Sequence, residues 1–389
     1  MSRDRVLTVA GALLAGLLLA PLLAAGQAPA PTVTPPYKPS LTATRRPPVI
    51  LATFTPAPTP TASPTPSLAA LEPPPAGVNP LTGLPVADPS RLERRPLLVK
   101  ISNYPAEVRP QSAINRADHV WEHVVEGGGT RFTAVFLSED ISKIGSVRSA
   151  RLVDVYLVPL YRGLLAYSGG SAGTMQRLQA QPWFGDRTFS PEEGDDCPLF
   201  CRYDPTYEGQ DWWHTMFADA EAIRAQAAAL GVDERVDLRG LTFSDGPPPG
   251  GTPYASISVS YPGTNNYWFY SASANKHYRW AEGEKHLDDL GDVQVGYTNV
   301  VLIYAAHVED TNVVEDQVRG VSYATDIQLV GDGPAVIFRN GLRYDGRWVR
   351  PGDEGMIRLV DEAGRDIPLA PGGTWFHLLP LDHTGLTVN

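Results

Sequence analysis

The sequence contains few cysteines, and it has no run of basic residues. Only two of its 389 residues are cysteine, and a structural zinc site needs four ligands, so these two thiols without nearby histidine are too few. Lysine and arginine do not cluster as they do in nucleic-acid-binding proteins, and the net charge is −11. We therefore expect no nucleic-acid partner and no cofactor.

Charged residues are also scarce, at 19%, whereas the chain has 37 prolines and 36 glycines. This excess indicates a low-complexity part together with a turn-rich, β-rich part. Hydrophobic residues make up 43%, an ordinary globular value, and the length suits two domains of ~100–200 residues each. Cys197 and Cys201 are separated by three residues, which favours a small-loop disulfide in an exported protein.

The first 28 residues have the features of an export segment. Arg3 and Arg5 precede an apolar stretch over residues 6–25, and Ala24, Ala25 and Gly26 are small residues that a signal peptidase accepts. The stretch is also long enough to span a bilayer uncleaved, so a signal peptide and a membrane anchor both remain open. No cysteine follows that could carry a lipid. We expect an extracytoplasmic protein, either secreted or anchored to the outer face of a bacterial membrane.

Residues 29–78 follow as a proline/threonine stalk. Sixteen prolines occur between Pro29 and Pro80, and proline lacks an N–H donor and disfavours helix in the residue before it, so this stretch cannot build a core. An extended spacer and a disordered linker are equally consistent with it.

The region 79–240 is predicted to be an α/β domain. Strands are expected at residues 97–103, 130–137 and 163–168. They alternate with helices at residues 115–126, 150–160, 171–181 and 219–230. Strands that alternate with helices are typical of an α/β layer.

The region 252–389 is predicted to be an antiparallel all-β domain, after a linker at residues 245–251. Short strands are expected at residues 256–261, 266–271, 277–281, 299–307, 324–330, 335–339, 342–349, 356–360 and 374–379. Asn340 and Gly341 form a hairpin signal. The fold class is therefore α+β, with an α/β domain followed by an antiparallel β domain.

A long series of ordered motifs carries a resemblance. It includes Arg95-Pro96, Ile101-Ser102-Asn103, Arg109-Pro110-Gln111-Ser112, Glu126-Gly127-Gly128 and Ile144-Gly145 through Arg151, and it returns at residues 326–331 and 373–375. In these motifs the chain resembles the YerB-like family of bacterial envelope lipoproteins, a two-part domain of unknown function. The resemblance implies a cell-surface protein with no established chemistry. This chain departs from it in lacking the lipid-accepting cysteine and in having Thr215 after His214 where Asn is expected.

His119, Glu122 and His123 fit the H-x-x-E-H pattern of inverted zinc peptidases. On a helix, the two histidines would share one face and could hold zinc, with Glu122 as the base. The alternative is an amphipathic helix with acidic residues along one face.

Gly169, Ser171 and Gly173 fit the G-x-S-x-G pattern of a nucleophile elbow. His214 lies downstream, with Asp204 and Asp211 near it, in the chain order of a hydrolase triad. The alternative is a tight turn that the glycines permit.

Arginines form a third constellation, near glycine-rich turns and a helix start that favour anions. The predicted ligand-binding residues are Asn103, Arg109, Gln111, Ser112, Arg131, Arg148 and Arg151. In the structural alternative, Arg131, Arg148 and Arg151 pair with Glu122, Glu126 and Asp154.

Aromatic residues are dense between residues 261 and 280 and could form either a glycan-stacking surface or the core of a sheet. The residues are Tyr261, Tyr267, Trp268, Tyr270, Tyr278 and Trp280.

The leading hypothesis for the function is a non-catalytic binding or scaffold module that recognises an anionic or glycan component of the envelope. The alternative is a hydrolase of envelope polymers that uses Glu122 or Glu126 as acid/base, Ser171 with His214, or zinc at His119 and His123. A third possibility is a purely structural partner of another envelope protein. Convergence of Glu126, Arg131, Arg148 and His214 around an open pocket would favour the hydrolase. The membrane is a further partner if the N-terminal segment is retained.

Overall fold

The computed structural model describes residues 71–191, 196–203, 211–316 and 321–389. The predicted export segment and most of the predicted stalk lie outside these ranges. The described residues lie in one compact unit. Within the described ranges, no helix is long and apolar enough to cross a membrane.

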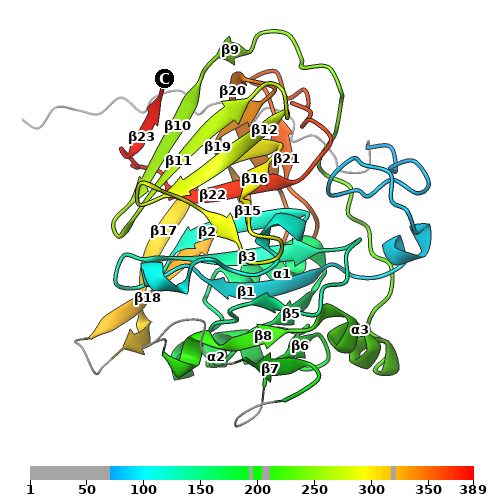
Figure 1. Ribbon diagram of the computed structural model, residues 1–389, viewed down its shortest axis with the longest axis vertical. Helices are drawn as coiled ribbons and strands as arrows, with labels where there is room; N and C mark the ends of the chain where they lie inside the picture. The colour runs from blue at the N-terminus through cyan, green and yellow to red at the C-terminus, as the bar shows by residue number, and fades with distance from the viewer. Residues whose placement is uncertain (1–70, 192–195, 204–210, 317–320) are drawn as a thin grey trace, which may run out of the picture. The chain divides into compact units, whose positions relative to one another are not determined.

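One large sheet runs through both halves of the chain (Figure 1). Its strand order is β21-β20-β19-β17-β22-β2-β3-β1-β5-β6, and β9 and β18 pair with β20 and β17. The bounds are β1 Leu97–Ser102, β2 His119–Val124, β3 Thr130–Phe136, β5 Leu164–Ala166, β6 Thr188–Phe189, β9 Thr252–Pro253, β17 Asn299–Asp316, β18 Ser322–Gln328, β19 Gly331–Arg339, β20 Leu342–Arg350, β21 Arg358–Val360 and β22 Thr374–Pro380.

The remaining elements are a six-stranded sheet, two small sheets and three helices (Figure 1). The six-stranded sheet has the order β13-β12-β11-β10-β23, with β16 paired to β12. Its bounds are β10 Ser256–Tyr261, β11 Thr264–Ser271, β12 Lys276–Ala281, β13 Glu284–Lys285, β16 Gly296–Tyr297 and β23 Leu386–Val388. The others are β4 Ile144–Gly145, β7 Phe200–Arg202, β8 Met216–Ala218, β14 Leu287–Asp288, β15 Val293–Gln294, α1 Asp154–Tyr161, α2 Ala172–Gln179 and α3 Ala220–Ala229.

β22 joins the two halves. It lies between β17 and β2 and is parallel to both, with Val120 opposite Trp375 and Glu122 opposite His377. The central strands are buried on both faces, as is typical where layers cover a sheet on each side. Phe132 and Trp375 belong to the core beneath the six-stranded sheet, and Trp121 to the core beneath α1.

The predicted fold class is confirmed: the first half mixes strands with a few helices, and the second half is rich in antiparallel strands. The hairpin prediction is confirmed as well. Asn340 and Gly341 connect β19 to β20 as a two-residue loop, and both have positive φ (50° and 72°), as a type I′ turn requires.

The predicted helix at residues 115–126 is wrong. Residues 114–116 form a single 3-10 turn, and β2 follows from His119. β2 is hydrogen-bonded to β3 on one side and to β22, about 250 residues later in the chain, on the other. Because both faces are covered, the strand shows no alternation of apolar and polar residues that would have distinguished it from a helix.

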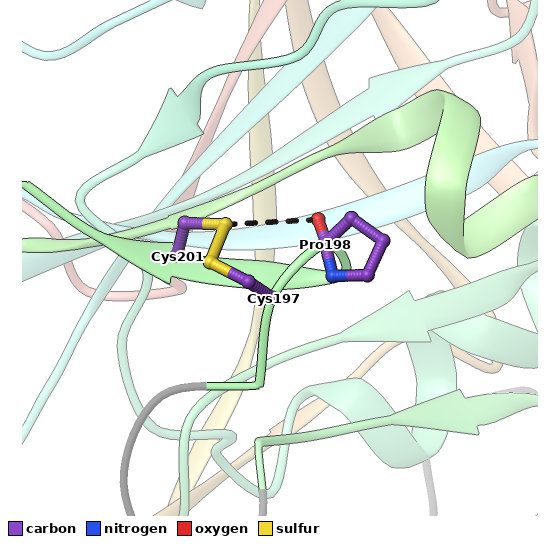
Figure 2. The surroundings of a disulfide bond; sticks show 3 residues. All are labelled: Cys197, Pro198 and Cys201. Atoms are coloured by element: carbon purple, nitrogen blue, oxygen red, sulfur yellow. Dashed lines mark hydrogen bonds between the residues drawn. A yellow bond between two sulfur atoms is a disulfide. The ribbon is translucent and has the colours of Figure 1, made fainter.

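A disulfide joins Cys197 and Cys201 (Figure 2). Cys201 lies in β7, which pairs with β8, and β8 pairs with β4. His214 precedes β8 by one residue. The disulfide therefore belongs to the small sheet that positions His214.

Candidate functional site

Two clusters of polar side chains lie on opposite faces of the large sheet. Successive residues of a strand point to opposite faces, so β2 directs Glu122 toward the six-stranded sheet and His123 toward α1. We call the Glu122 group the paired cluster, since its charges are matched. We call the group around Arg131, Arg148 and Arg151 the arginine cluster.

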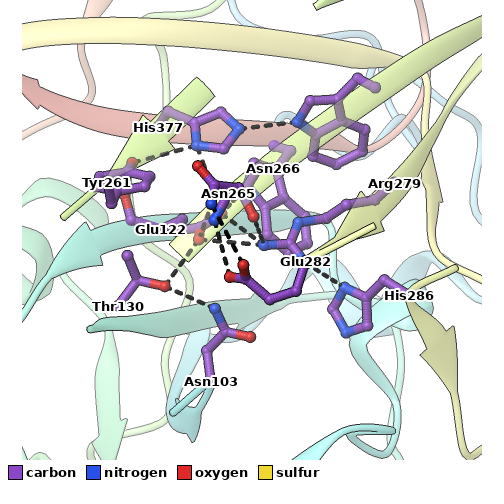
Figure 3. A network of polar contacts seen from close by, with 12 residues as sticks. Asn103, Glu122, Thr130, Tyr261, Asn265, Asn266, Arg279, Glu282, His286 and His377 are labelled. Atoms are coloured by element: carbon purple, nitrogen blue, oxygen red, sulfur yellow. Dashed lines mark hydrogen bonds and ion pairs between the residues drawn. The ribbon is translucent and has the colours of Figure 1, made fainter. Parts of the chain in front are cut away.

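The paired cluster surrounds the carboxylate of Glu122 (Figure 3). Arg279 Nη2 lies 3.2 Å from both carboxylate oxygens. The other donors, with their distances, are Thr130 Oγ1 at 2.9 Å, Asn266 Nδ2 at 3.1 Å and Trp375 Nε1 at 3.2 Å. The Glu122 side chain has no exposed surface. Strands of both halves therefore meet on one buried carboxylate.

Electrostatics keep Glu122 ionised. Burial alone would raise the pKa of Glu122, but Arg279, His377 and the hydrogen-bond donors outweigh it and hold the pKa below 4.5. Burial lowers the pKa of His377 to about 4, so this histidine is neutral near pH 7 and Arg279 is the counter-ion. Because both oxygens are engaged and enclosed, the geometry gives Glu122 a structural role and not that of an acid/base toward an external substrate.

The zinc hypothesis for His119 and His123 is wrong, because β2 is a strand. Four residues along a strand separate the two side chains by roughly 13 Å, too far to share one ion. His119 contacts Tyr161 Oη and the Leu81 carbonyl, each at 2.7 Å, and His123 contacts Lys100 Nζ at 3.0 Å. Among the residues that the structure describes, no group of three or more potential ligands could hold a metal.

Lys100 lies on the α1 face of the sheet with no exposed side-chain surface. Its ammonium group is 2.8 Å from Asp154 Oδ1 and 2.6 Å from Thr133 Oγ1. Burial lowers the pKa of Lys100 to about 8, against the opposing effect of Asp154. Asp154 is thus occupied by Lys100, and its other oxygen accepts from the Arg151 backbone N–H at 2.8 Å.

The arginine cluster lies next to this pair. Arg151 Nε donates to Glu126 at 2.8 Å, and Glu126 also accepts from the Thr325 backbone at 3.2 Å. Arg131 Nη1 donates to the Ser149 carbonyl at 3.0 Å. Among the described residues, Arg131 and Arg148 have no carboxylate within the 4.0 Å of an ion pair. One arginine of the three is therefore paired as the structural alternative predicted, and two are not.

The cations of this cluster disfavour one another. Burial, Arg151 and Arg148 hold the pKa of Arg131 well below 12.5. Burial and Arg151 also lower the pKa of Arg148, and only Asp211 opposes them. Burial, with Arg148 next, lowers the pKa of His214 to about 4. Arg131, Arg148 and His214 are thus within electrostatic reach of one another, whereas the sequence hypothesis asked for their convergence with Glu126 around an open pocket and stays a prediction.

Ser171 is the N-cap of α2. Its hydroxyl donates to Glu315 at 3.0 Å and accepts from the Thr174 backbone N–H at 3.1 Å. No hydrogen bond joins Ser171 to His214 in the described ranges, and Asp204 lies outside them. Both bonds of the hydroxyl serve the helix start, so the described residues supply no activated serine.

The remaining predicted ligands lie apart from the arginine cluster. Gln111 is fully buried and bonds the Ser102 carbonyl at 2.8 Å and His286. Asn103 donates to Thr130 at 2.6 Å. Both support the paired cluster, and Ser112 donates to the Lys143 carbonyl at 2.8 Å.

Arg109 lines a pocket of about 270 Å³ together with Lys285 and His286. Burial lowers its pKa, and among the charged groups Arg279 has the largest effect. Arg109 is therefore on the side of the paired cluster and does not join Arg131 and Arg148.

Several residues of both clusters were missed from the sequence. Lys100 could have been noticed, since a lysine within the apolar strand Leu-Leu-Val-Lys-Ile requires a buried partner. Arg279, His377 and Glu315 carry no such signal, because their partners come from elements more than a hundred residues away.

The fold and the clusters define a class: a two-part domain whose halves complete one sheet around a buried ion pair. The chain belongs to the DUF3048 family, described as a protein of unknown function, with its N-terminal domain at residues 81–233 and its C-terminal domain at residues 257–376.

The chain is 28% identical to "Putative lipoprotein YerB" of Bacillus subtilis (strain 168) over 306 residues, which are 77% of this chain and 86% of that protein. The crystal structure of YerB from Bacillus subtilis matches with a TM-score of 0.65 and 25% identity, over 80% of this chain and 99% of the other. These likenesses bear out the resemblance found in the sequence motifs.

Proposed function

We propose that this is an extracytoplasmic envelope protein that binds an oxyanion, a phosphate or carboxylate group of an envelope component, through Arg131 and Arg148. The apolar N-terminal segment supports this location, as does the description of the YerB relative as a lipoprotein. In the proposal, a retained N-terminal segment would attach the protein to the membrane.

The observation that carries the proposal is the state of Arg131. Arg131 is only 7% exposed, and within the described part of the chain its guanidinium makes one hydrogen bond, to a neutral carbonyl. A buried charge without a counter-ion costs several kcal/mol. An oxyanion bound between Arg131 and Arg148 would supply the missing charge, because a guanidinium matches a carboxylate or phosphate in a bidentate way.

The neighbouring carboxylates do not remove this need. Glu126 is held by Arg151 at 2.8 Å, Asp154 by Lys100 at 2.8 Å, and Glu315 by the start of α2. Each of these carboxylates therefore already has another partner and is not the counter-ion of Arg131. Arg148 is only partly buried, so the cluster has a side on which a ligand could approach.

The test is isothermal titration of the folded protein with inorganic phosphate, pyrophosphate and citrate, at matched ionic strength. We expect binding of at least one probe, and a roughly 10- to 100-fold weaker affinity in Arg148→Gln, since a hydrogen bond to a charged group contributes ~1.5–3 kcal/mol. Arg365→Gln is the matched control, because its side chain is 81% exposed. Affinity for none of the probes, or equal affinity in Arg148→Gln, would refute the proposal.

Arg148→Lys tests the structural alternative. Lysine keeps the charge but not the planar fork. We expect weaker anion binding with little change in stability. A loss of stability without any effect on anion binding would assign Arg148 to the fold.

A further inference from the structure

The six-stranded sheet has an unusual outer face. Its inner face carries Trp268 and Arg279, which contact the paired cluster. The outer face carries a second set of aromatic side chains: Tyr267 and Phe269 of β11 are 37% and 49% exposed, and Tyr278 and Trp280 of β12 are partly exposed. The outward face of such a sheet is ordinarily polar, so burial in the core does not explain these rings.

The strand register aligns this face into rows. In the first row Tyr267 is opposite Trp280, and the row continues to Lys285 on one side and to Ser258 and Thr387 on the other. Five strands at ~4.8 Å make this row roughly 19 Å long.

The second row runs from Ser256 through Phe269 to Tyr278. Phe269 also contacts Trp280, with ring centroids 6.1 Å apart. The rows therefore form one continuous aromatic area that is flanked by hydroxyl groups.

The polar tips of these rings have no partners within the described ranges: neither phenol hydroxyl, of Tyr267 or Tyr278, nor the indole N–H of Trp280 forms a hydrogen bond there. A ligand that stacks on the rings could therefore also form hydrogen bonds with their polar tips and with the neighbouring hydroxyls.

The charge of the face sets a second condition on the ligand. The chain has a net charge of −11, yet Lys285 at the end is the one charged member of the two rows. The positions just beyond the rows add one lysine, Lys276, and one glutamate, Glu282. The rings themselves therefore carry no charge and match an uncharged ligand.

We propose that this outer face binds an uncharged saccharide chain. A pyranose ring combines an apolar C–H face, which stacks on aromatic rings, with equatorial hydroxyls that bond Tyr, Trp, Ser and Thr groups. A row of rings and hydroxyls suits a linear chain of such units. The proposal is independent of the arginine cluster, because it rests on other residues and another ligand chemistry.

The test is binding of two uncharged probes, a β-1,4-linked tetramer of N-acetylglucosamine and cellotetraose, by titration calorimetry and by tryptophan fluorescence. We expect binding of at least one probe. Trp280→Ala and Tyr267→Ala should each weaken it roughly tenfold or more, since each removes a stacking ring. Circular dichroism and the melting temperature of each variant establish that it is folded.

Two controls separate the alternatives. Trp213→Ala removes a more accessible ring, 55% exposed, outside the sheet face and should leave saccharide affinity unchanged. Arg148→Gln should also leave it unchanged. Affinity for neither probe, or a loss in Trp213→Ala that equals the loss in Trp280→Ala, would overturn the proposal. So would self-association of the wild type that Trp280→Ala abolishes, because the face would then be an interface between copies.

Discussion

The paired cluster and the arginine cluster lie on opposite faces of β2 and β3, and they differ in whether a buried charge has an opposite charge beside it. Glu122 has a guanidinium, an indole, an amide and a hydroxyl as donors to its two oxygens. Arg131, one residue after Thr130 in the same strand, donates to a single carbonyl among the residues that the structure describes. A buried charge that is matched on all sides holds a fold together, whereas a buried charge that is left unmatched indicates a site. Under the proposed function, this difference separates charges that hold the fold from charges that would bind a ligand within one sheet.

Breaking the paired cluster should have the largest effect. Glu122→Gln keeps the shape but leaves Arg279 buried without a counter-ion, and breaking a buried pair in this way costs about 3–5 kcal/mol of unfolding free energy. Urea unfolding measures it, with the exposed Glu284→Gln as control. A loss below about 1 kcal/mol would mean that Glu122 does not join the two halves.

Acid should weaken the same side of the sheet. His277 and His377 have folded pKa values of about 4, against 6.5 when exposed, because burial disfavours their charged form. Between pH 6.5 and 4 the unfolded state therefore binds more protons, and stability falls as pH falls, by roughly 2–3 kcal/mol for each histidine. Asp118 opposes this, since burial raises its pKa to about 6.

The slope of unfolding free energy against pH measures this effect. His377→Gln should reduce the slope by about one proton. An unchanged slope in this variant would show that His377 is already protonated beside Glu122 in the folded state.

The arginine cluster should respond in the opposite direction. Without an added anion, Arg148→Gln should leave the free energy of unfolding, measured by thermal unfolding, unchanged or raise it by up to about 1 kcal/mol, because it removes a partly buried cation that Arg151 disfavours. With phosphate in large excess the order should reverse, since the wild type binds it more tightly and gains more stability from it. If Arg148→Gln is less stable than the wild type both with and without phosphate, Arg148 has a structural role.

A similarly small effect, of opposite sign, is expected at Ser171. Ser171→Ala removes the N-cap of α2 and should cost about 1 kcal/mol. Thermal unfolding measures this loss. Labelling of the wild-type serine by a fluorophosphonate probe would contradict the capping role, because the cap engages the hydroxyl with the Thr174 N–H and with Glu315.

Much of the fold could be predicted. Apolar runs and turn residues are local signals in the sequence. They predicted the strands around residues 97–102 and 130–136, the turn at Asn340-Gly341, and the change near residue 250 from mixed helices and strands to short strands. β2 could not be predicted, because its partner β22 follows about 250 residues later in the chain. Both of its faces are covered, so its residues do not alternate between apolar and polar. The zinc hypothesis failed for the same reason, since it needed a helix.

The candidate site, like the fold, has a part that could be predicted from the sequence and a part that could not. The sequence by itself determined the family motifs, the grouping of arginines near Gly127 to Gly129 and the hydroxyl at the start of α2, since each depends on neighbours along the chain. Only the tertiary structure decided which charges are matched. Arg151 forms an ion pair with Glu126, and Glu122 forms one with Arg279 of β12. Arg131 and Arg148 form no ion pair with a carboxylate among the described residues. The physical reason is that an ion pair forms only between groups that the sheet brings within a few ångströms of each other, and here strands of both halves do so across more than 150 residues.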